Sequence, residues 1–500
     1  MTTEAQLITW LKGSNTTRVV LVEIESVLVG GSPTNFKLSS RPYSDTATNT
    51  QYIACVSGGV SFTENINLSG TPSIGYGDIE ISNPILSDYT GLRDAWLNYV
   101  WGNKKVTVLI GDVSWVRSDF YPIFSGLIRD IDSKSRTTLN LLLVDNMQRL
   151  NVAVSDTLLT GIYSTADKLI PVTFGECFNV TPLLINPATL TYQVHTGQIA
   201  EIIEVRDNGA PVTLLGNSVT GVNLTAGTFQ LARSPYGTVT CSVRGSAPAG
   251  AYKQYIGEII RDILTNYGGK LTDATYINAT NFTNFDTATA YKVGAYVDSR
   301  QNVLELCYKL AASIGAYLVL GLDGKFKLTQ VKSDYATGTG LRKVTTTDME
   351  ASTFTLRQKL DVQGAIKLAY CKNWTVQATG LAAGVAASST TVFARDYYYI
   401  NSKDTTVLSN YSQSPEPPPI ETLLIEKTPA TTEADRLLAL YKVPRYIYTG
   451  VYYGHMLTAE LGDTIDVTHP RFGLSTGKTG TIVEINRDWL KGRVTLGVFI

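Results

Sequence analysis

Charged residues are scarce in this sequence of 500 residues. Asp, Glu, Lys and Arg make up 17% of the chain, whereas about 25% is usual for a globular protein. The formal net charge is only -1. A large chain with so little charge solvates poorly alone, so we expect partners to cover much of its surface. No basic block occurs, which argues against binding nucleic acid through its phosphates.

Paired cysteines and long apolar runs are also missing. The five cysteines are Cys55, Cys177, Cys241, Cys307 and Cys371. None has the CxxC spacing of zinc or iron–sulfur sites, so we expect reduced and mostly buried thiols in a chain folded in a cytoplasm. No segment approaches the roughly 18 apolar residues of a membrane span, and the first residues lack the pattern of a signal peptide. We expect neither feature.

The sequence also lacks histidines at the spacing of a local catalytic or metal-binding motif. The histidines His195, His455 and His469 lie too far apart in the sequence to form a local metal or triad motif. His469 precedes Pro470 in a predicted loop, where a structural or interface role is favoured over catalysis. We therefore predict no catalytic, cofactor-binding or metal-binding residues, no cofactor, and a protein that is not an enzyme.

Two pairs of carboxylates were the strongest candidates against that prediction. Asp130 and Asp132 project to one face of a predicted strand, and paired carboxylates can perform acid–base chemistry. A solvated strand end is the simpler interpretation. Asp463 and Asp466 form a similar pair, and Gly462-Asp463 indicates a turn.

A loop near the C-terminus resembles a phosphate-binding loop. It runs from Gly473 to Thr479, but Phe472 occupies the position where that motif requires its first glycine. The residues that follow alternate as in a strand, where a phosphate site needs a helix. A hairpin loop is therefore favoured.

Tyrosine is abundant, with 28 copies. Three are consecutive, at Tyr397, Tyr398 and Tyr399, and more lie between Tyr446 and Tyr453. Strand alternation places Tyr397 and Tyr399 on one face and Tyr398 on the other. We expect a strand covered on both faces, so packing and interface roles are favoured over stacking on sugars.

Hydrophobic patterning predicts a mainly β, multi-domain chain with an α+β insert. Residues 1–150 carry short strand patterns, a short helix around Leu7 and Leu11, and helical spacing from Tyr89 to Trp101. The first helix is expected to pack on its own domain, and a docking arm for a neighbouring subunit is the alternative. Residues 151–250 form a second, small β domain.

Residues 251–350 change to a helical period, with two helices and a hairpin. We predict Asp298 or Ser299 as the N-cap of the second helix, and a turn at Asp323-Gly324. Residues 351–500 return to strand patterns, including Val392–Ile400. The segment Thr379–Thr391 between two of these strands lacks large side chains, so we expect an unanchored contact loop.

The C-terminal segment from His455 to Ile500 predicts a closing β-meander. It contains Leu461-Gly462-Asp463, then His469 to Leu474 (HPRFGL), then Trp489 to Arg493 (WLKGR). Together with Val106–Asp112 (VTVLIGD) and Phe124–Ile131 (FSGLIRDI), these runs resemble the hub proteins of bacteriophage tails.

The resemblance implies an architecture and a role. It implies two β-barrel domains similar to tail-tube subunits, at 1–150 and 351–500, which flank the smaller β and α+β modules. It also implies a trimeric ring at the baseplate or tail tip of the virion, assembled in the host cytoplasm, which caps the tail tube and opens for DNA ejection. The implied partners are the tail tube protein, the distal tail protein, the tape-measure protein and a central fibre or spike. DNA would pass through the lumen without specific binding. The alternatives are a tail-associated peptidoglycan hydrolase and a carbohydrate-binding adhesin that uses the tyrosines.

Overall fold

The computed structural model describes residues 2–13, 16–82, 95–133, 135, 137–160, 168–333 and 335–500. The chain divides into two compact units, each built from segments that are distant in sequence. Unit 1 joins Met1–Arg149, Val319–Asp361 and Pro444–Ile500, and unit 2 joins Leu150–Leu318 and Val362–Val443. Strands predominate in several sheets, which confirms the mainly β, multi-domain prediction. The boundaries of the four predicted domains stay predictions.

Unit 1 takes elements from the start, the middle and the end of the chain. Its N-terminal elements are α1 Glu4–Lys12, β1 Arg18–Leu28, β2 Pro33–Ser39, β3 Tyr43–Asp45, β4 Thr50–Ala54, β5 Val56–Asn65, β6 Tyr76–Ser82, η1 Trp96–Asn98, β7 Tyr99–Val100, β8 Lys104–Asp112, η2 Arg117–Asp119, β9 Tyr121–Asp132, β10 Thr138–Val144 and η3 Asn146–Leu150. The later elements are the end of β20 Ala316–Leu320, β21 Phe326–Gln330, β22 Arg342–Val344, η6 Ala351–Thr353, β23 Thr355–Leu360, β27 Arg445–Tyr453, η7 Gly454–Met456, β28 Thr464–Val467, β29 Lys478–Asp488 and β30 Arg493–Phe499. Unit 1 takes up β20 at Val319.

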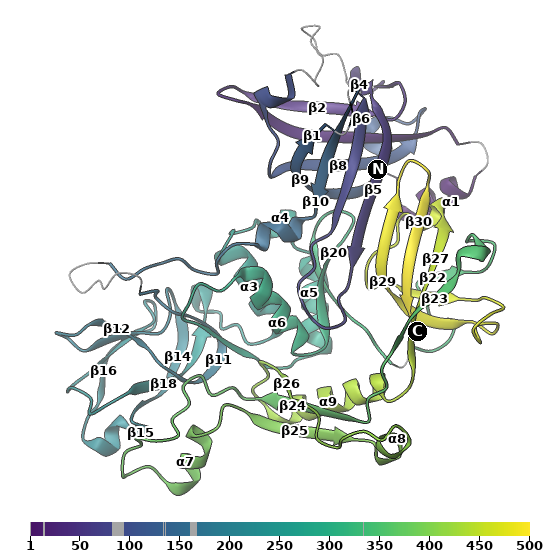
Figure 1. Cartoon of the computed structure of the whole chain (residues 1–500). Coiled ribbons are helices and arrows are strands. Elements are labelled where there is room, and N and C mark those ends of the chain that lie inside the picture. The colour runs from purple at the N-terminus through teal and green to yellow at the C-terminus, as the bar shows by residue number, and fades with distance from the viewer. Residues whose placement is uncertain are drawn as a thin grey trace. The chain divides into compact units, whose positions relative to one another are not determined.

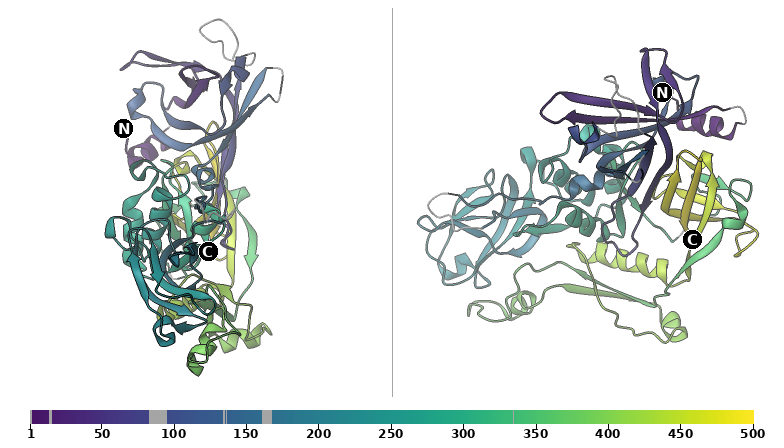
Figure 2. Two further views of the ribbon diagram at one scale, coloured as in Figure 1. Left: turned by 90° about the vertical axis from the view of Figure 1, so that its left-hand side faces the viewer. Right: turned by 45° about the horizontal axis from the view of Figure 1, so that its top comes forward.

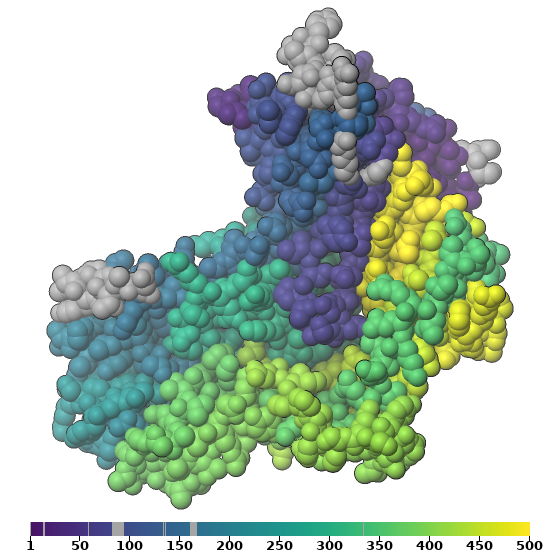
Figure 3. Space-filling view, viewed as in Figure 1, coloured from purple at the N-terminus to yellow at the C-terminus, as the bar shows by residue number. Residues whose placement is uncertain are grey.

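One sheet runs through most of unit 1, in the order β23-β27-β30-β29-β5-β6-β10-β9-β8-β1-β2-β4-β3. Its N-terminal and C-terminal strands meet at the antiparallel pair β5–β29, where Asn65 lies opposite Glu484 and Ser61 opposite Asp488. Figure 1 shows the yellow strands β29 and β30 beside the purple β5, and the two colours also adjoin on the surface in Figure 3. The closure of either group of strands into a barrel stays a prediction.

An aromatic cluster packs beneath this meeting of strands. Phe62 of β5 lies with its ring centroid 4.3 Å from that of Phe124 on β9, and Trp489, just after β29, lies 5.6 Å from Phe124. Phe62 and Trp489 are fully buried. Each such aromatic pair stabilises by about 0.5–1.5 kcal/mol beyond the burial of its area. Strands from both ends of the chain thus share one core.

The first helix, α1, packs within its own unit. Thr3 is the N-cap in a capping box with Gln6, and Leu7 and Leu11 are the buried residues of the helix. The helix contacts η7, near the start of the closing meander. Trp10 Nε1 also donates to Asp112 Oδ2 at 3.2 Å, so the helix contacts the predicted N-terminal domain as expected and the C-terminal segment as well.

The closing meander is confirmed in β28, β29 and β30. The segment Gly473–Gly477 lies in the loop between β28 and β29, and a strand follows from Lys478, as the hairpin interpretation requires. Gly492, in the turn before β30, has a φ of 63°, a left-handed conformation that suits glycine. The last residue, Ile500, exchanges two backbone hydrogen bonds with Tyr446, both of 2.9 Å.

Unit 2 contains most of the helices. Its first segment holds β11 Val172–Val180, β12 Leu183–Asn186, β13 Thr191–Gln193, β14 Ile199–Asp207, β15 Ala210–Pro211, η4 Val212–Leu215, β16 Val219–Asn223, β17 Thr228–Leu231, β18 Val239–Ser246, η5 Pro248–Gly250, α3 Ile256–Asn266, α4 Asp273–Tyr276, α5 Ala279–Ala288, β19 Gly294–Val297 and α6 Val303–Ala312. Its second segment holds β24 Ala365–Tyr370, α7 Ala387–Phe393, β25 Tyr398–Lys403, α8 Thr405–Asn410, β26 Ile420–Glu421 and α9 Lys427–Tyr441.

Three sheets organise unit 2, with orders β15-β14-β18-β11-β19, β12-β13-β17-β16 and β25-β24-β26. The first two share a buried core that includes Val194, Phe229 and Cys241. Helix α9 packs on β24 and β25 through Ala434 and Leu438 (Figure 2). The described cysteines are free thiols, and all except the half-buried Cys371 are buried, in agreement with the expectation.

Two predictions in the helical region meet different outcomes. The hairpin turn at Asp323-Gly324 is confirmed, because β20 pairs with β21 across it. The predicted N-cap at Asp298 or Ser299 is wrong: α6 begins at Val303, and the side chain of Asn302 accepts the N–H of Leu304 at 2.8 Å. Residues 301 and 303 instead form backbone hydrogen bonds with 154 and 152, so tertiary pairing keeps the preceding segment extended.

The region from 379 to 400 also differs from its prediction. The strand predicted over Val392–Ile400 is wrong in its first half, where α7 ends at Phe393, and β25 begins only at Tyr398. The segment Thr379–Thr391 is not without anchors, since Ala382 N–H donates to Asn208 O at 2.9 Å. Phe393 is buried and stacks on Phe178 with centroids 6.0 Å apart. A single large side chain therefore draws the end of this segment into the core.

The helical spacing from Tyr89 to Trp101 is described only in part. Residues 83–94, including Leu92, lie outside the described residues. Beyond them the chain forms the short η1 and then β7, which pairs with β1. The end of the predicted helix is therefore a strand.

Candidate functional site: a charged junction in unit 1

The three histidines occupy separate environments. His195 is buried in unit 2, where Thr173 N–H donates to its Nδ1 at 2.9 Å and its Nε2 lies 2.8 Å from Tyr267 Oη. Because Nδ1 accepts, Nε2 carries the proton. Burial lowers the pKa of His195 to about 3. The neutral imidazole thus has a structural role, through its contacts with Thr173 and Tyr267.

The other two histidines lie in unit 1. His455 Nε2 lies 3.2 Å from Asp348 Oδ1, and burial lowers the pKa of His455. The ring of His469 lies 4.6 Å from that of Phe354, centroid to centroid, and is buried. The structural interpretation of His469 agrees with this packing.

The two candidate carboxylate pairs also lie in different environments. Asp130 and Asp132 are exposed on β9, as the solvated interpretation requires. Asp463 pairs with Arg342 at 2.9 Å, whereas Asp466 is buried and accepts the N–H of Gly340 at 3.0 Å. Each residue of the second pair thus has its own structural partner.

The tyrosine strand is covered less completely than predicted. Tyr397 is buried, but Tyr399, expected on the same face, is 44% exposed. Tyr398 is half-buried and lies with its ring centroid 5.8 Å from that of Tyr370. Within this chain the strand is therefore not covered on both faces, because Tyr397 precedes β25 and does not continue its alternation. Cover by a partner stays a prediction.

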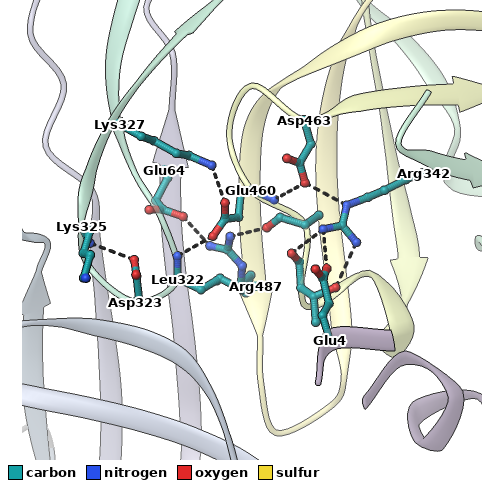
Figure 4. Close-up of polar contacts among 12 residues, drawn as sticks. Glu4, Glu64, Leu322, Asp323, Lys325, Lys327, Arg342, Glu460, Asp463 and Arg487 are labelled. Carbon is teal, nitrogen blue, oxygen red and sulfur yellow. Dashed lines mark hydrogen bonds and ion pairs between the residues drawn. The ribbon is translucent and has the colours of Figure 1, made fainter. Parts of the chain in front are cut away.

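The structure instead concentrates charge where three segments of unit 1 meet (Figure 4). At the β5–β29 pair, Arg487 Nη1 forms an ion pair with Glu64, and its Nη2 donates to Ala459 O at 2.6 Å. The side chain of Arg487 is 3% exposed and that of Glu64 13%. Buried charges are stable only when they are paired and hydrogen-bonded. We call the residues labelled in Figure 4 the charged junction: Glu4, Glu64, Leu322, Asp323, Lys325, Lys327, Arg342, Glu460, Asp463 and Arg487.

The middle segment enters the junction through β21 and the turn before it. Lys327 forms an ion pair with Glu460, which also accepts the N–H of Leu322 at 2.7 Å. Burial alone would raise the pKa of Glu460, but Lys327 and the Leu322 amide bring it below its ordinary value. Glu460 is thus a carboxylate that ties the β20–β21 turn to the C-terminal segment.

Arg342 connects the same segments to the first helix. Its Nε donates to Asp463 at 2.9 Å, its Nη1 to Thr458 Oγ1 at 2.9 Å, and its Nη2 contacts Glu4 of α1 at 2.9 Å. Burial would lower the pKa of Arg342, but Asp463 and Glu4 raise it above its ordinary value. A guanidinium offers five donors in a planar fork, which suits such a multiple contact.

The sequence contained one signal of this junction. Thr481, Val483 and Ile485 are buried at alternate positions of β29, where Ile482 is also buried, and Arg487 continues their alternation. A charged residue in phase with buried positions indicates a buried partner. The identity of that partner depends on the pairing of β29 with β5, which no local pattern specifies.

Among the residues that the structure describes, two hollows are lined mainly by residues outside the junction. One, of about 450 Å³ in unit 1, is lined by Glu23 and Arg117, which form a two-bond ion pair at 2.7 and 2.6 Å. The other, of about 650 Å³ in unit 2, is lined by Asp262 and Asp286. Among the residues that the structure describes, no group of three or more His, Cys, Asp or Glu is placed to hold a metal ion. Nor is any helix in these described ranges long and apolar enough to cross a membrane.

Comparison with known proteins finds similarity only at the level of structure. No protein-family model matches the chain. No curated protein sequence matches it either. Among solved structures, the chain is similar to the 43 kDa tail protein of prophage MuSo2 from Shewanella oneidensis, with 10% identity, a TM-score of 0.39, and coverage of 97% of this chain and 98% of that one.

Two further solved structures are similar at the same level. The prophage tail protein gp18 from Listeria monocytogenes EGD-e has 9% identity and a TM-score of 0.40, with 96% of this chain and 94% of that chain covered. A chain of the virion of a native gene transfer agent particle has 12% identity and a TM-score of 0.40, with coverage of 71% and 90%. The first two are named as prophage tail proteins, and the third is part of a gene transfer agent virion.

Proposed function

We propose that this chain is a structural, non-enzymatic hub of a phage tail, located at the baseplate or tail tip of the virion. The observation that carries the proposal is the placement of the hub-like motifs. Val106–Asp112 lies in β8 and Phe124–Ile131 in β9, while Trp489–Arg493 runs through the turn after β29 to the first residue of β30. These runs belong to one sheet. Motifs from both ends of the chain therefore build a single body, as a hub that joins two tube-like regions requires.

The proposed assembly is a homotrimeric ring. The resemblance implies two tube-like regions in each chain, and three chains then present six similar surfaces to a sixfold tail tube. Closed rotational symmetry also covers strand edges that an isolated subunit leaves exposed. Strand β23, at one end of the large sheet, is largely exposed along its length, which agrees with such a role.

The proposed partners follow from the same resemblance. The ring caps the tail tube and contacts the tail tube protein, the distal tail protein, the tape-measure protein and a central fibre or spike. DNA passes through its lumen without specific binding when the ring opens. The low charge of the chain supports extensive partner contacts. The chain is made and assembled in the host cytoplasm.

The mass of the purified protein tests this proposal. Light scattering should give about three times the protomer mass of 54.4 kDa. A stable dimer, or six chains in a ring, would contradict the hub assembly. A lysis band on host cell walls in a zymogram would favour the hydrolase, and glycan binding that Tyr398→Ala abolishes would favour the adhesin.

A further inference from the structure

A small cavity lies inside the charged junction. Its volume is about 10 Å³, and its polar lining comes from Glu64, Ser125, Asp145 and Arg487. A cavity of roughly this size holds one water molecule when several polar groups surround it. The cavity is bordered by β5, β9, the end of β10, the β20–β21 turn and β29. Any change in its charge therefore acts on the contact between the N-terminal and C-terminal strands.

Asp145 is the most deeply placed carboxyl of this lining. It is 5% exposed, and its Oδ1 accepts the N–H of Met147 at 2.9 Å while its Oδ2 accepts the N–H of Gly75 at 2.5 Å. These donors are backbone amides, which do not neutralise a charge. Burial raises the pKa of Asp145 well above its ordinary value, and the nearby carboxylate of Glu64 raises it further.

Arg487 supplies the second observation. Its Nη1 and Nη2 are engaged by Glu64 and Ala459. Its Nε, also buried, has no hydrogen-bond partner among the described residues. A buried donor without a partner costs about 1–3 kcal/mol. One water in the cavity would accept this N–H and could donate to a lining carboxyl.

Carboxyls outnumber cations around this point. The charged groups of the elements packed there are Glu64 on β5, Arg487 on β29, Glu460 before β28, Lys327 on β21, Asp323 in the β20–β21 turn and Arg149 on η3. Lys327 is paired with Glu460, and Arg149 Nε donates to Asn146 at 3.1 Å. The guanidinium of Arg487 is paired with Glu64, and Arg487, Glu64 and Asp145 line the same cavity.

We propose that Glu64, Asp145 and Arg487 form a proton-binding site, with one water in the cavity and one proton retained on the Asp145 carboxyl at neutral pH. As pH rises, this proton passes to solvent and leaves two buried carboxylates beside one guanidinium. The junction between β5 and β29 then loosens. The site concerns the fold of unit 1 and does not rest on the proposed tail function.

Infrared spectroscopy of the full-length protein tests the site directly. A protonated carboxyl has a carbonyl band distinct from that of a carboxylate. We expect this band in the wild type at neutral pH, its loss in Asp145→Asn, and its retention in the matched control Asp132→Asn, which changes an exposed carboxylate. In Glu64→Gln the neighbouring negative charge is gone, so the band should disappear at a lower pH than in the wild type.

Each outcome decides the proposal. A band that Asp145→Asn leaves unchanged, or a band whose pH midpoint Glu64→Gln does not lower, overturns it. If Asp145→Asn does not fold, the comparison of Glu64→Gln with the wild type decides alone: a lowered midpoint supports the proton site and an unchanged midpoint refutes it.

Discussion

Glu64 and Arg487 form a buried ion pair although 423 positions separate them in the chain. Glu64 belongs to β5 and Arg487 to β29, the two strands through which the N-terminal and C-terminal parts of unit 1 join. The pair thus marks the point where long-range pairing completes the sheet. Breaking this pair should reduce the free energy of unfolding strongly, because a charge removed from water is costly without its partner.

Replacement of Arg487 by methionine should therefore destabilise unit 1 strongly. Arg487→Met leaves Glu64 buried without a cation, and breaking a buried pair in this way costs about 3–5 kcal/mol. Denaturant unfolding followed by circular dichroism measures the loss. The control Lys491→Met breaks the exposed Lys491–Asp488 pair and should change stability by less than about 1 kcal/mol. Equal losses of stability in the two variants would show that the Glu64–Arg487 pair stabilises the fold no more than an exposed pair does.

Much of the fold was predictable because strand alternation is a local signal. The run from Arg18 to Val27, the run from Val106 to Ile110 and the closing meander all became strands. The pairing of β5 with β29 was not predictable, since register between distant strands depends on tertiary packing. The ion pair of the site was not predictable either, because Glu64 and Arg487 come together only when β5 pairs with β29.

Local signals failed where tertiary contacts compete with them. Asp298 and Ser299 are good capping residues, but backbone pairing of residues 301 and 303 holds the chain extended until Asn302 can cap α6. The segment before Phe393 has a loop-like composition, yet the burial of that one ring orders a helix. In both places a contact with a distant segment decided the outcome.

His195 should make the stability of unit 2 depend on pH. Its pKa is about 3 in the folded state and about 6.5 when unfolded, so below pH 6.5 the unfolded chain binds a proton that the folded chain does not. The free energy of unfolding should therefore fall by about 2 kcal/mol between pH 8 and pH 5. Denaturant unfolding at the two pH values measures it.

Two variants isolate the contribution of His195. His195→Asn keeps an oxygen that can accept the Thr173 N–H but cannot be charged, so the pH dependence should become smaller by this amount. Tyr267→Phe removes the hydroxyl next to Nε2 and retains the imidazole, so the dependence should persist. A slope that His195→Asn leaves unchanged would assign it to other groups.

Phe393 should anchor the segment that the sequence suggested to be an unanchored loop. The ring is 5% exposed, stacks on Phe178, and has Arg206 5.5 Å from its centroid. Phe393→Ala should cost about 3 kcal/mol, measured by denaturant unfolding. Val376→Ala is the control, because Val376 is 49% exposed and should cost less than about 0.5 kcal/mol. A neutral Phe393→Ala would return the segment Thr379–Thr391 to a pure contact role.

The final strand should be indispensable to unit 1. Strand β30 lies between β27 and β29, and it pairs with both along its length. Val494, Leu496 and Val498 are fully buried and Phe499 is 1% exposed, whereas Ile500 is only half-buried.

Deletion of residues 494–500 removes four buried side chains, each stabilising by about 1.5–3 kcal/mol. It also leaves the inner edges of β27 and β29 without hydrogen-bond partners. The sum of roughly 6–12 kcal/mol is comparable to the whole stability of a typical domain, about 5–15 kcal/mol. We therefore expect the truncated chain to aggregate or to lose its cooperative melting transition. Deletion of Ile500 alone removes the backbone pair with Tyr446 and one half-buried side chain, and should leave a folded protein with a lower melting temperature. If the protein without residues 494–500 does not aggregate and melts at the same temperature as the wild type, β30 is not part of the core.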